Sequence, residues 1–219
     1  MKLYGSTTSP FVRIVRIAAI ELGLGDRLEL VPTVVKPTQA NRDYAATVNP
    51  IRRVPALETD AGAIIVDSRV IAEHLDLEAG TGKLTPPEPR ARVACLNRHA
   101  VLTGGIEALV LAMYETKLRP DALRWDAWVD DQIDKAHAAL DWAEARADAF
   151  DGFRLDTIAL VAFLGYARFR FAEIDWAASR ARQAPREEAA AAPPPGGLDN
   201  TQQKNPPRNA HERGRAGGR

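Results

Sequence analysis

Residues 2–25 read KLYGSTTSPFVRIVRIAAIELGLG, which predicts a short β-strand followed by an α-helix. Pro10 suits the first turn of a helix, because the N–H that it lacks would be unpaired there in any case. Apolar residues then recur at helical spacing from Phe11 to Leu22, and the glycines beyond them end the run. Ser9 stands directly before Pro10, where a hydroxyl can cap the helix.

The next sixty or so residues continue with short strands and a further helix. Residues 28–34 predict a second strand, with Pro32 indicating an edge or an end, and the intervening helix makes the first two strands parallel. Residues 54–58 and 63–66 flank the sequence TDAG, which predicts an antiparallel hairpin. Helical spacing returns after Asp67-Ser68, a pair that stands at a capping position.

Composition divides the chain into parts. Residues 1–80 alternate strands with helices, and the stiff sequence TPPEP lies within a predicted linker over residues 81–89. Residues 90–178 carry apolar helical periodicity throughout. We therefore expect an α/β domain followed by an all-helical domain, and then a tail over residues 179–219.

Three helices are predicted in the second part. The first carries apolar residues from Leu96 to Met113, and Gly104-Gly105 can bend it. The second has one apolar face that begins at Trp125 and ends at Ala143. The third contains so many apolar residues between Ile158 and Tyr166 that we expect it to be buried on most sides.

The tail has a different composition. Residues 180–219 contain a single large apolar residue, Leu198, together with eight basic and four acidic residues and the sequence PPPGG. Such a segment cannot form a core, so we expect a disordered, basic, Pro/Gly/Ala-rich tail. Its scattered arginines come without aromatic residues, which is a weak pattern for nucleic-acid binding.

The overall composition excludes several classes of protein. Lys and Arg total 29, as do Asp and Glu, so the charge favours neither nucleic acid nor membranes. A single cysteine, Cys95, rules out a disulfide framework, a cysteine-rich zinc site and a dithiol redox pair. The histidines lack metal-site spacing, so no metal is expected. With neither a signal-peptide nor a membrane-span pattern, the sequence predicts a cytoplasmic protein.

The order of the short motifs resembles the glutathione transferase family. These motifs are Thr8-Ser9-Pro10-Phe11 at the helix start, Asn49-Pro50, Val54-Pro55-Ala56-Leu57 and Asp67-Ser68. The chain is most similar to small bacterial transferases with serine in the first helical turn, and the similarity covers about residues 1–178. The resemblance implies a thioredoxin-like, glutathione-binding first domain, a helical domain that contributes the electrophile pocket, and pairing of two chains.

The resemblance implies that Ser9 stabilises the glutathione thiolate. A free thiol has a pKa of about 8.5, and lowering it by two units requires roughly 2.7 kcal/mol. A hydrogen bond to a charged acceptor contributes about 1.5–3 kcal/mol and a helix N-terminus about 0.3–1 kcal/mol, so the two suffice. An ordinary helix cap is the alternative role for Ser9, and Thr7 and Thr8 are weaker candidates as donors.

The other glutathione contacts follow from the same resemblance. Val54-Pro55 matches a cis-proline motif whose preceding backbone pairs with the cysteinyl part of glutathione, although a trans proline at a strand start is the alternative. Asp67 and Ser68 would bind the γ-glutamyl end, Asp67 facing its ammonium group, or would form a plain cap. The candidates for the remaining contacts are Lys36, Gln39, Arg42 and Arg53 for the glycyl carboxylate, and Phe11, Met113 and Tyr114 beside the thiol and in the electrophile pocket.

The sequence departs from the family pattern in two places. The buried helix of the second domain usually begins with a Ser or Thr cap and an Asp three residues later, whereas Arg154 and Thr157 stand here and Asp156 is the candidate for a shifted cap. The tail also stands where the family has further amphipathic helices. We hypothesise a changed reading frame after codon 178, which translation of the other two frames tests. A catalytically weak or inactive transferase-like binding or regulatory protein is therefore the alternative.

Overall fold

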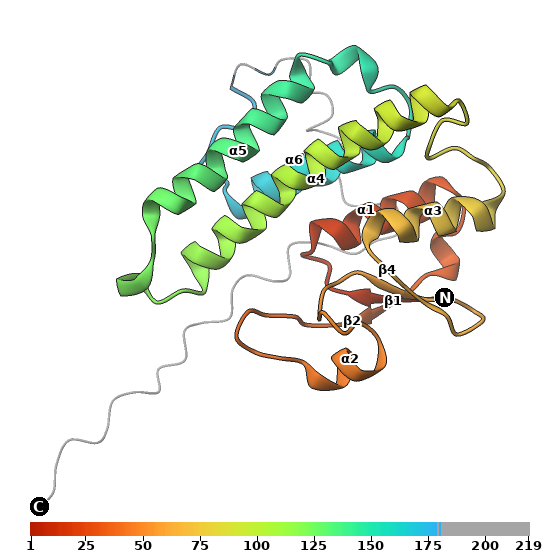
Figure 1. The fold of residues 1–219 in the computed structure, drawn as a ribbon, viewed down its shortest axis with the longest axis horizontal. Coiled ribbons are helices and arrows are strands. Elements are labelled where there is room, and N and C mark those ends of the chain that lie inside the picture. Colours follow the sequence, from red (N-terminus) through yellow and green to blue (C-terminus); the bar gives the residue numbers. More distant parts are fainter. Residues whose placement is uncertain (179, 181–219) are drawn as a thin grey trace, which may run out of the picture.

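The computed structural model describes residues 1–178 and Arg180 (Figure 1). The elements in chain order are β1 (Lys2–Gly5), α1 (Pro10–Glu21), β2 (Glu29–Pro32), α2 (Arg42–Thr47), β3 (Ala56–Glu58), β4 (Ile64–Val66), α3 (Ser68–Ala79), α4 (Pro89–Lys117), α5 (Asp126–Glu144) and α6 (Leu155–Arg170), with short 3₁₀ turns at Gly25–Arg27, Asp121–Leu123 and Ala147–Ala149. The predicted order of an α/β part followed by a helical part is confirmed. Apart from Arg180, the predicted tail lies outside the described residues.

The four strands form one mixed sheet in the order β2-β1-β3-β4. β1 and β2 are parallel, whereas β3 is antiparallel to both β1 and β4, as predicted. β2 lies at an edge of the sheet and ends at Pro32, which has no N–H for a ladder. Figure 1 shows α1 and α3 on one face of the sheet and α2 on the other. This layering places the start of α1 beside the end of β1.

The core lies on both sides of α1. α1 packs against both α3 and α6, and its fully buried apolar residues are Val12, Ile14, Val15, Ala18 and Ala19. α6 packs against both α1 and α4, and nearly all of its residues from Leu155 to Ala167 are buried. The prediction that this helix is buried on most sides is therefore confirmed, and α6 joins the two parts of the fold.

Two contacts fix the relative direction of α4 and α6. Arg98 Nε of α4 lies 2.6 Å from Asp156 Oδ2 of α6. Further along both helices, Gly105 of α4 lies against the ring of Phe163 of α6. Gly105 follows Arg98 in α4 by the same number of residues as Phe163 follows Asp156 in α6. The two helices therefore run parallel and stay in register. Continuing that register places Arg170, at the end of α6, level with Ala112 of α4.

α1 runs in the opposite direction. A hollow of about 310 Å³ is lined both by Glu21, at the end of α1, and by residues 151–154, which directly precede α6. The start of α1 therefore lies at the end of α6, as Figure 1 shows. Since α1 has 12 residues, its two ends are about 18 Å apart, and the hollow is remote from Ser9.

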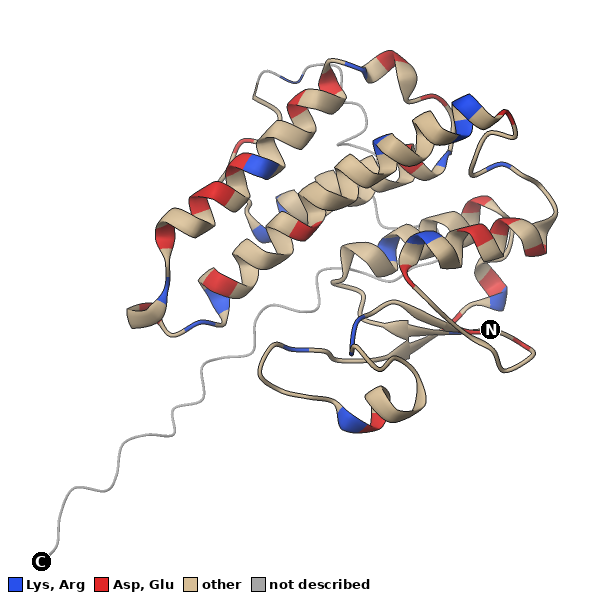
Figure 2. Cartoon of the chain, in the orientation of Figure 1, with Lys and Arg blue, Asp and Glu red and all other residues tan. Residues whose placement is uncertain are grey.

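α5 forms the outer layer of the helical part. Figure 2 shows acidic residues along the length of this helix. The predicted apolar face was wrong at Trp125, which is 66% exposed, because this residue precedes the first turn of α5 and is not part of the helix. Among residues 1–178, no helix has both the length and the apolar composition needed to cross a membrane.

Substitution by alanine is expected to change the free energy of unfolding in opposite directions at the adjacent glycines Gly104 and Gly105 of α4. At Gly105 a Cβ would lie 2.4 and 2.6 Å from atoms of the Phe163 ring, whereas at Gly104 it would meet nothing within 4 Å. We expect Gly105→Ala to lower the free energy of unfolding by about 1–3 kcal/mol, and Gly104→Ala to raise it by about 0.5–1 kcal/mol. Urea denaturation of both variants measures this. Equal effects would contradict the close packing of α4 on α6.

Candidate functional site

Ser9 is the N-cap of α1. Its backbone is extended, with φ −79° and ψ 125°, and its Oγ accepts a hydrogen bond from the Val12 amide at 3.4 Å. Pro10 follows as the first helical residue, as predicted. The capping bond is long and uses a lone pair of the oxygen, so the hydroxyl proton can be donated to an anion in front of the helix. Capping and anion binding are therefore compatible roles for Ser9.

Two of the neighbouring hydroxyls, those of Ser6 and Thr8, are already paired. Ser6 Oγ and Thr8 Oγ1 lie 2.7 Å apart, and Ser6 Oγ also accepts the Thr8 amide at 3.2 Å. The Ser9 hydroxyl has no such side-chain partner among the described residues. Of the hydroxyls of Ser6, Thr8 and Ser9, the last is the one best placed to serve a ligand.

The segment before β3 offers an unpaired backbone edge. The Val54–Pro55 peptide bond is cis, which confirms the cis-proline expectation over the trans alternative. Within the described residues neither the amide nor the carbonyl of Val54 takes part in a hydrogen bond, because the ladder of β3 begins only at Ala56. An extended peptide can therefore add to this edge through both groups.

Two residues that the sequence did not single out as site residues hold this segment. The Tyr44 hydroxyl and Asn49 Nδ2 both donate to the Arg53 carbonyl at 2.9 Å. Asn49 Oδ1 also accepts the Ile51 amide at 3.1 Å. Asn49 belongs to the Asn-Pro motif, whereas no local pattern marks Tyr44, which lies in α2. Both residues are buried and hold the segment that carries Val54.

Asp67-Ser68 begins α3, as predicted. Asp67 is the N-cap, and its Oδ1 accepts the Arg69 amide at 2.8 Å. Its φ of 74° is unusual for a residue other than glycine and is tolerated best by Asp and Asn. The exposed Asp67 carboxylate and the first amides of α3 thus lie side by side, a pairing that suits a ligand with both an ammonium and a carboxylate group.

The four candidates for the glycyl carboxylate lie in two places. Lys36 and Gln39 form a tight turn, in which the Gln39 amide donates to the Lys36 carbonyl at 3.3 Å, and Arg42 begins α2. Arg53 directly precedes Val54 and is exposed. Burial raises the pKa of Tyr114 in α4 and the positive charge of Arg53 opposes that rise, so Arg53 lies near this part of α4.

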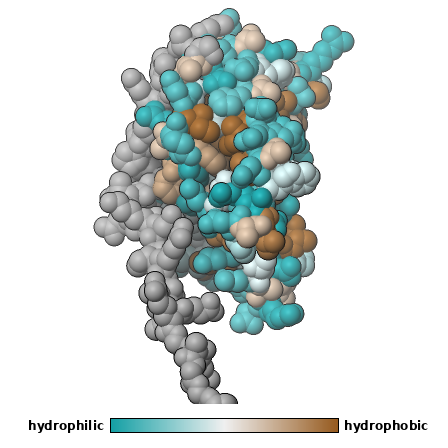
Figure 3. All heavy atoms as spheres, turned by 90° about the vertical axis from the view of Figure 1, so that its left-hand side faces the viewer, coloured by the Kyte–Doolittle hydropathy of each residue, from teal (hydrophilic) through white to brown (hydrophobic). Residues whose placement is uncertain are grey.

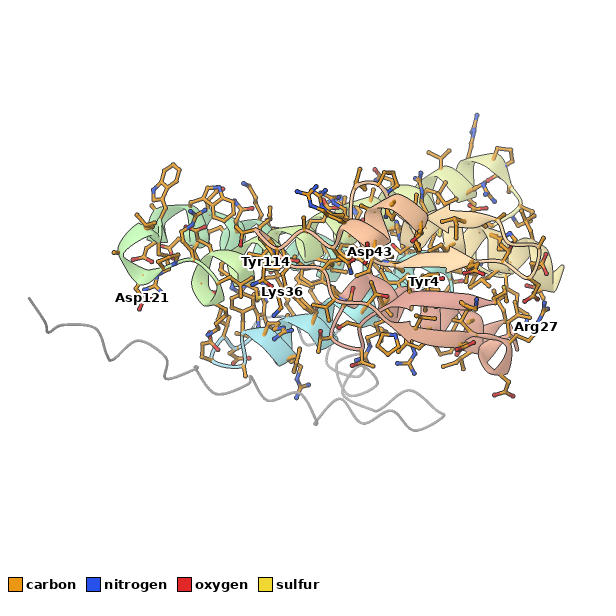
Figure 4. All side chains as sticks on the ribbon, turned by 90° about the horizontal axis from the view of Figure 1, so that it is seen from below. Tyr4, Arg27, Lys36, Asp43, Tyr114 and Asp121 are labelled. Carbon is orange, nitrogen blue, oxygen red and sulfur yellow. The ribbon has the colours of Figure 1, made fainter. Side chains whose placement is uncertain are left out.

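The residues predicted for the electrophile pocket gather at the same end of the molecule. Phe11 lies in the first turn of α1, while Met113 and Tyr114 lie near the end of α4, and all three are partly buried. Figure 4 shows Tyr114 and Lys36 between Asp121 and Arg27, which lie at opposite ends of the view. Figure 3 looks at this end and shows apolar patches within a hydrophilic surface.

Two buried groups are unsuited to proton transfer near neutral pH. Burial raises the pKa of the Cys95 thiol to about 11, and burial lowers the pKa of His99 to about 4. His99 is therefore neutral and Cys95 protonated near pH 7. Among the described residues, no three His, Cys, Asp or Glu side chains form a group that could hold a metal ion.

The beginning of α6 differs from the shifted cap that was predicted. Arg154 occupies the N-cap position without a side-chain hydrogen bond, and Asp156 lies inside the first turn. The Asp156 carboxylate is 1% exposed, accepts the Thr157 amide at 2.9 Å and pairs with Arg98. Asp156 is therefore a buried ion-pair partner rather than a cap.

Comparison with known proteins gave three kinds of match. A family model described as the N-terminal domain of glutathione S-transferase matches residues 3–83. The GST-like protein YibF of Escherichia coli K12, whose function is uncharacterized, is 31% identical over 184 residues, which cover 82% of this chain and 88% of that protein.

Two solved structures are similarly related. A glutathione transferase family member from Pseudomonas fluorescens Pf-5 with bound glutathione is 30% identical, with a TM-score of 0.80 over 88% of this chain and 95% of that one. A glutathione S-transferase from Methylobacterium radiotolerans in complex with glutathione sulfonate is also 30% identical, with a TM-score of 0.75 over 88% and 91% of the two chains.

Proposed function

Because the chain belongs to the glutathione S-transferase family, we propose that it binds glutathione and transfers the glutathione thiolate to a small apolar electrophile. The observation that carries this proposal is the unpaired backbone of Val54 just before β3, which lies beside β1, the strand that leads to the Ser9 hydroxyl. A cysteinyl residue paired with Val54 presents its sulfur to the start of α1. Relatives solved with glutathione or its sulfonate support this reading.

Each part of glutathione has a counterpart in the α/β unit. The cysteinyl amide and carbonyl pair with Val54, and the γ-glutamyl carboxylate lies at the start of α3 with Ser68 and the free amides. Asp67 faces the γ-glutamyl ammonium group. The glycyl carboxylate goes to Arg53 or to the cluster of Lys36, Gln39 and Arg42. These contacts leave the thiol directed at the first turn of α1.

Ser9 keeps the sulfur ionised. The thiol proton leaves to solvent, the Ser9 hydroxyl donates to the thiolate, and the amides of the first turn of α1 add a favourable field. The thiolate sulfur then bonds to the electrophilic carbon. Either the leaving group departs with its bonding pair, or the π bond opens and its electron pair takes a proton from solvent. Phe11, Met113 and Tyr114 cover the electrophile. A serine-type transferase of this kind would act in a reducing cytoplasm, in detoxification.

Retention of the protein on immobilised glutathione, followed by a conjugation assay with a chlorodinitrobenzene, tests this function. We expect retention that free glutathione reverses, and conjugation faster than the uncatalysed reaction. Retention without conjugation would instead identify a transferase-like binding or regulatory protein. Failure of both would refute the proposal.

We further propose that two chains pair through α3 and α4. Val70 and Leu77 are exposed and lie on the same face of α3 as Glu73, which is partly buried. Glu73 forms an ion pair with Arg92 of α4, next to Val93, which is 66% exposed. This surface is apolar enough to be covered by a second copy.

Light scattering coupled to size exclusion is expected to give twice the chain mass of 23.9 kDa. The variant Val70→Lys is expected to weaken pairing, because a charge would be buried in an apolar interface. Leu118→Lys is a matched control, since Leu118 is also exposed but lies at the far end of α4. A single-chain mass for the unmodified protein would contradict pairing.

A further inference from the structure

The end of α6 brings a cation to the electrophile pocket. The parallel register of α4 and α6 places Arg170 level with Ala112, within one turn of Met113 and Tyr114. The antiparallel packing of α1 on α6 places the same end of α6 at the start of α1. Arg170 therefore lies with Phe11 and Tyr114 on the helical side of the thiol.

The surroundings of Arg170 are aromatic. Its guanidinium carbon lies 4.4 Å from the centre of the Phe169 ring and 6.0 Å from that of Tyr166. Its Nε is buried and has no hydrogen-bond partner among the described residues. Burial raises the pKa of Tyr166 to about 12 and also raises the pKa of Tyr114. The positive charge of Arg170 partly offsets both rises, so this charge reaches both hydroxyls.

Such a guanidinium suits a carboxylate. Arginine presents its donors as a planar fork that matches the two oxygens of a carboxylate, and its flat group stacks on aromatic faces. The carboxylates of glutathione have counterparts in the α/β unit, at the start of α3 and at Arg53 or the Lys36 turn. The anion that fits Arg170 therefore belongs to the second substrate.

We propose that the electrophile carries a carboxylate on an apolar, aromatic body, and that Arg170 determines this specificity by binding the carboxylate. The inference rests on the proposed function, since it names the substrate class of the same site. Phe11, Met113 and Tyr114 contact the apolar body, and the reacting carbon faces the sulfur at Ser9.

A matched pair of chlorinated aromatic probes separates carboxylate recognition from conjugation. The probes are a chlorodinitrobenzoate and the amide with the same substitution pattern. In both, the thiolate sulfur bonds to the ring carbon that holds chlorine, chloride leaves with the bonding pair, and the thiol proton goes to solvent. The carboxylate or amide group is unchanged, so a difference in rate reports on its binding once each rate is divided by the uncatalysed rate.

We expect the unmodified protein to prefer the carboxylate probe by about 10- to 100-fold in kcat/KM, and Arg170→Gln to remove that preference while changing the amide rate about twofold or less. Arg168→Gln, which removes the same charge from an exposed position in the same turn, is expected to keep the preference. Arg170→Lys is expected to restore part of it. Circular dichroism checks that each variant is folded.

Binding of the two preformed conjugates gives a readout that does not depend on turnover. They share the glutathione half, so calorimetry is expected to show tighter binding of the carboxylate conjugate to the unmodified protein and equal binding of both conjugates to Arg170→Gln. Equal binding by the unmodified protein would overturn the inference while leaving the proposed function intact. If neither conjugate bound, both would fail.

Discussion

Replacement of Ser9 by alanine is expected to lower kcat/KM for conjugation by about 10- to 100-fold at neutral pH, and to raise the pKa of the bound thiol toward about 8.5. The hydroxyl is the sole side-chain donor that we assign to the sulfur, and a hydrogen bond to an anion contributes about 1.5–3 kcal/mol. The loss should shrink at alkaline pH, where the thiol ionises without assistance. Rates measured across the pH range test both statements.

Ser9 is also the cap of α1, so a second variant separates the two roles. An Ala cap costs about 1 kcal/mol of stability, whereas Gly at the same position costs only a few tenths. We expect Ser9→Gly to be nearly as stable as the unmodified protein and yet as slow as Ser9→Ala. Thr8→Val is expected to remain active, because Thr8 Oγ1 is already paired with Ser6. Full activity of Ser9→Gly would show that the hydroxyl is not the donor.

Removal of the Asp156 carboxylate is expected to destabilise the fold more than the loss of the Ser9 cap or the substitution of Gly105 by alanine. The variant Asp156→Ala leaves Arg98, whose side chain is 14% exposed, without its carboxylate, and leaves the Thr157 amide without an acceptor. Breaking a buried ion pair from one side costs about 3–5 kcal/mol. Urea denaturation should show a loss of that size in the free energy of unfolding.

The double variant Asp156→Leu with Arg98→Leu provides the control for this measurement. It removes both charges, so no uncompensated charge stays buried, and we expect it to recover part of the stability that Asp156→Ala loses. A loss below about 1 kcal/mol for Asp156→Ala would contradict the view that this pair joins α4 to α6.

The parts of the site that local patterns encode were predicted from the sequence. Ser9 before Pro10 indicated the start of α1, TDAG indicated the hairpin, and Asp67-Ser68 indicated the start of α3. Each of these signals lies within a few residues of the feature that it forms. The cis bond before Pro55 was recognised through the family resemblance, since a cis and a trans proline look alike in sequence.

The parts that distant contacts create were not predicted. Tyr44 was not identified because its hydroxyl reaches Arg53 only after the chain between them has folded. Asp156 was interpreted as a cap because its partner, Arg98, lies on another helix. Arg170 was not singled out, since only the packing of α6 against α1 and α4 brings it to the pocket. No short sequence pattern marks a residue whose role depends on a contact with a distant part of the chain.

The ionisation of glutathione bound to the unmodified protein tests the central claim most directly. Thiolate absorbs in the ultraviolet where the thiol does not, so a pH titration of the complex, corrected for the protein alone, gives the pKa of the bound thiol. A value one to two units below about 8.5 is the predicted result, as about 1.4–2.7 kcal/mol of stabilisation requires. A bound thiol that titrates like free glutathione would contradict the role of Ser9 and the proposed chemistry.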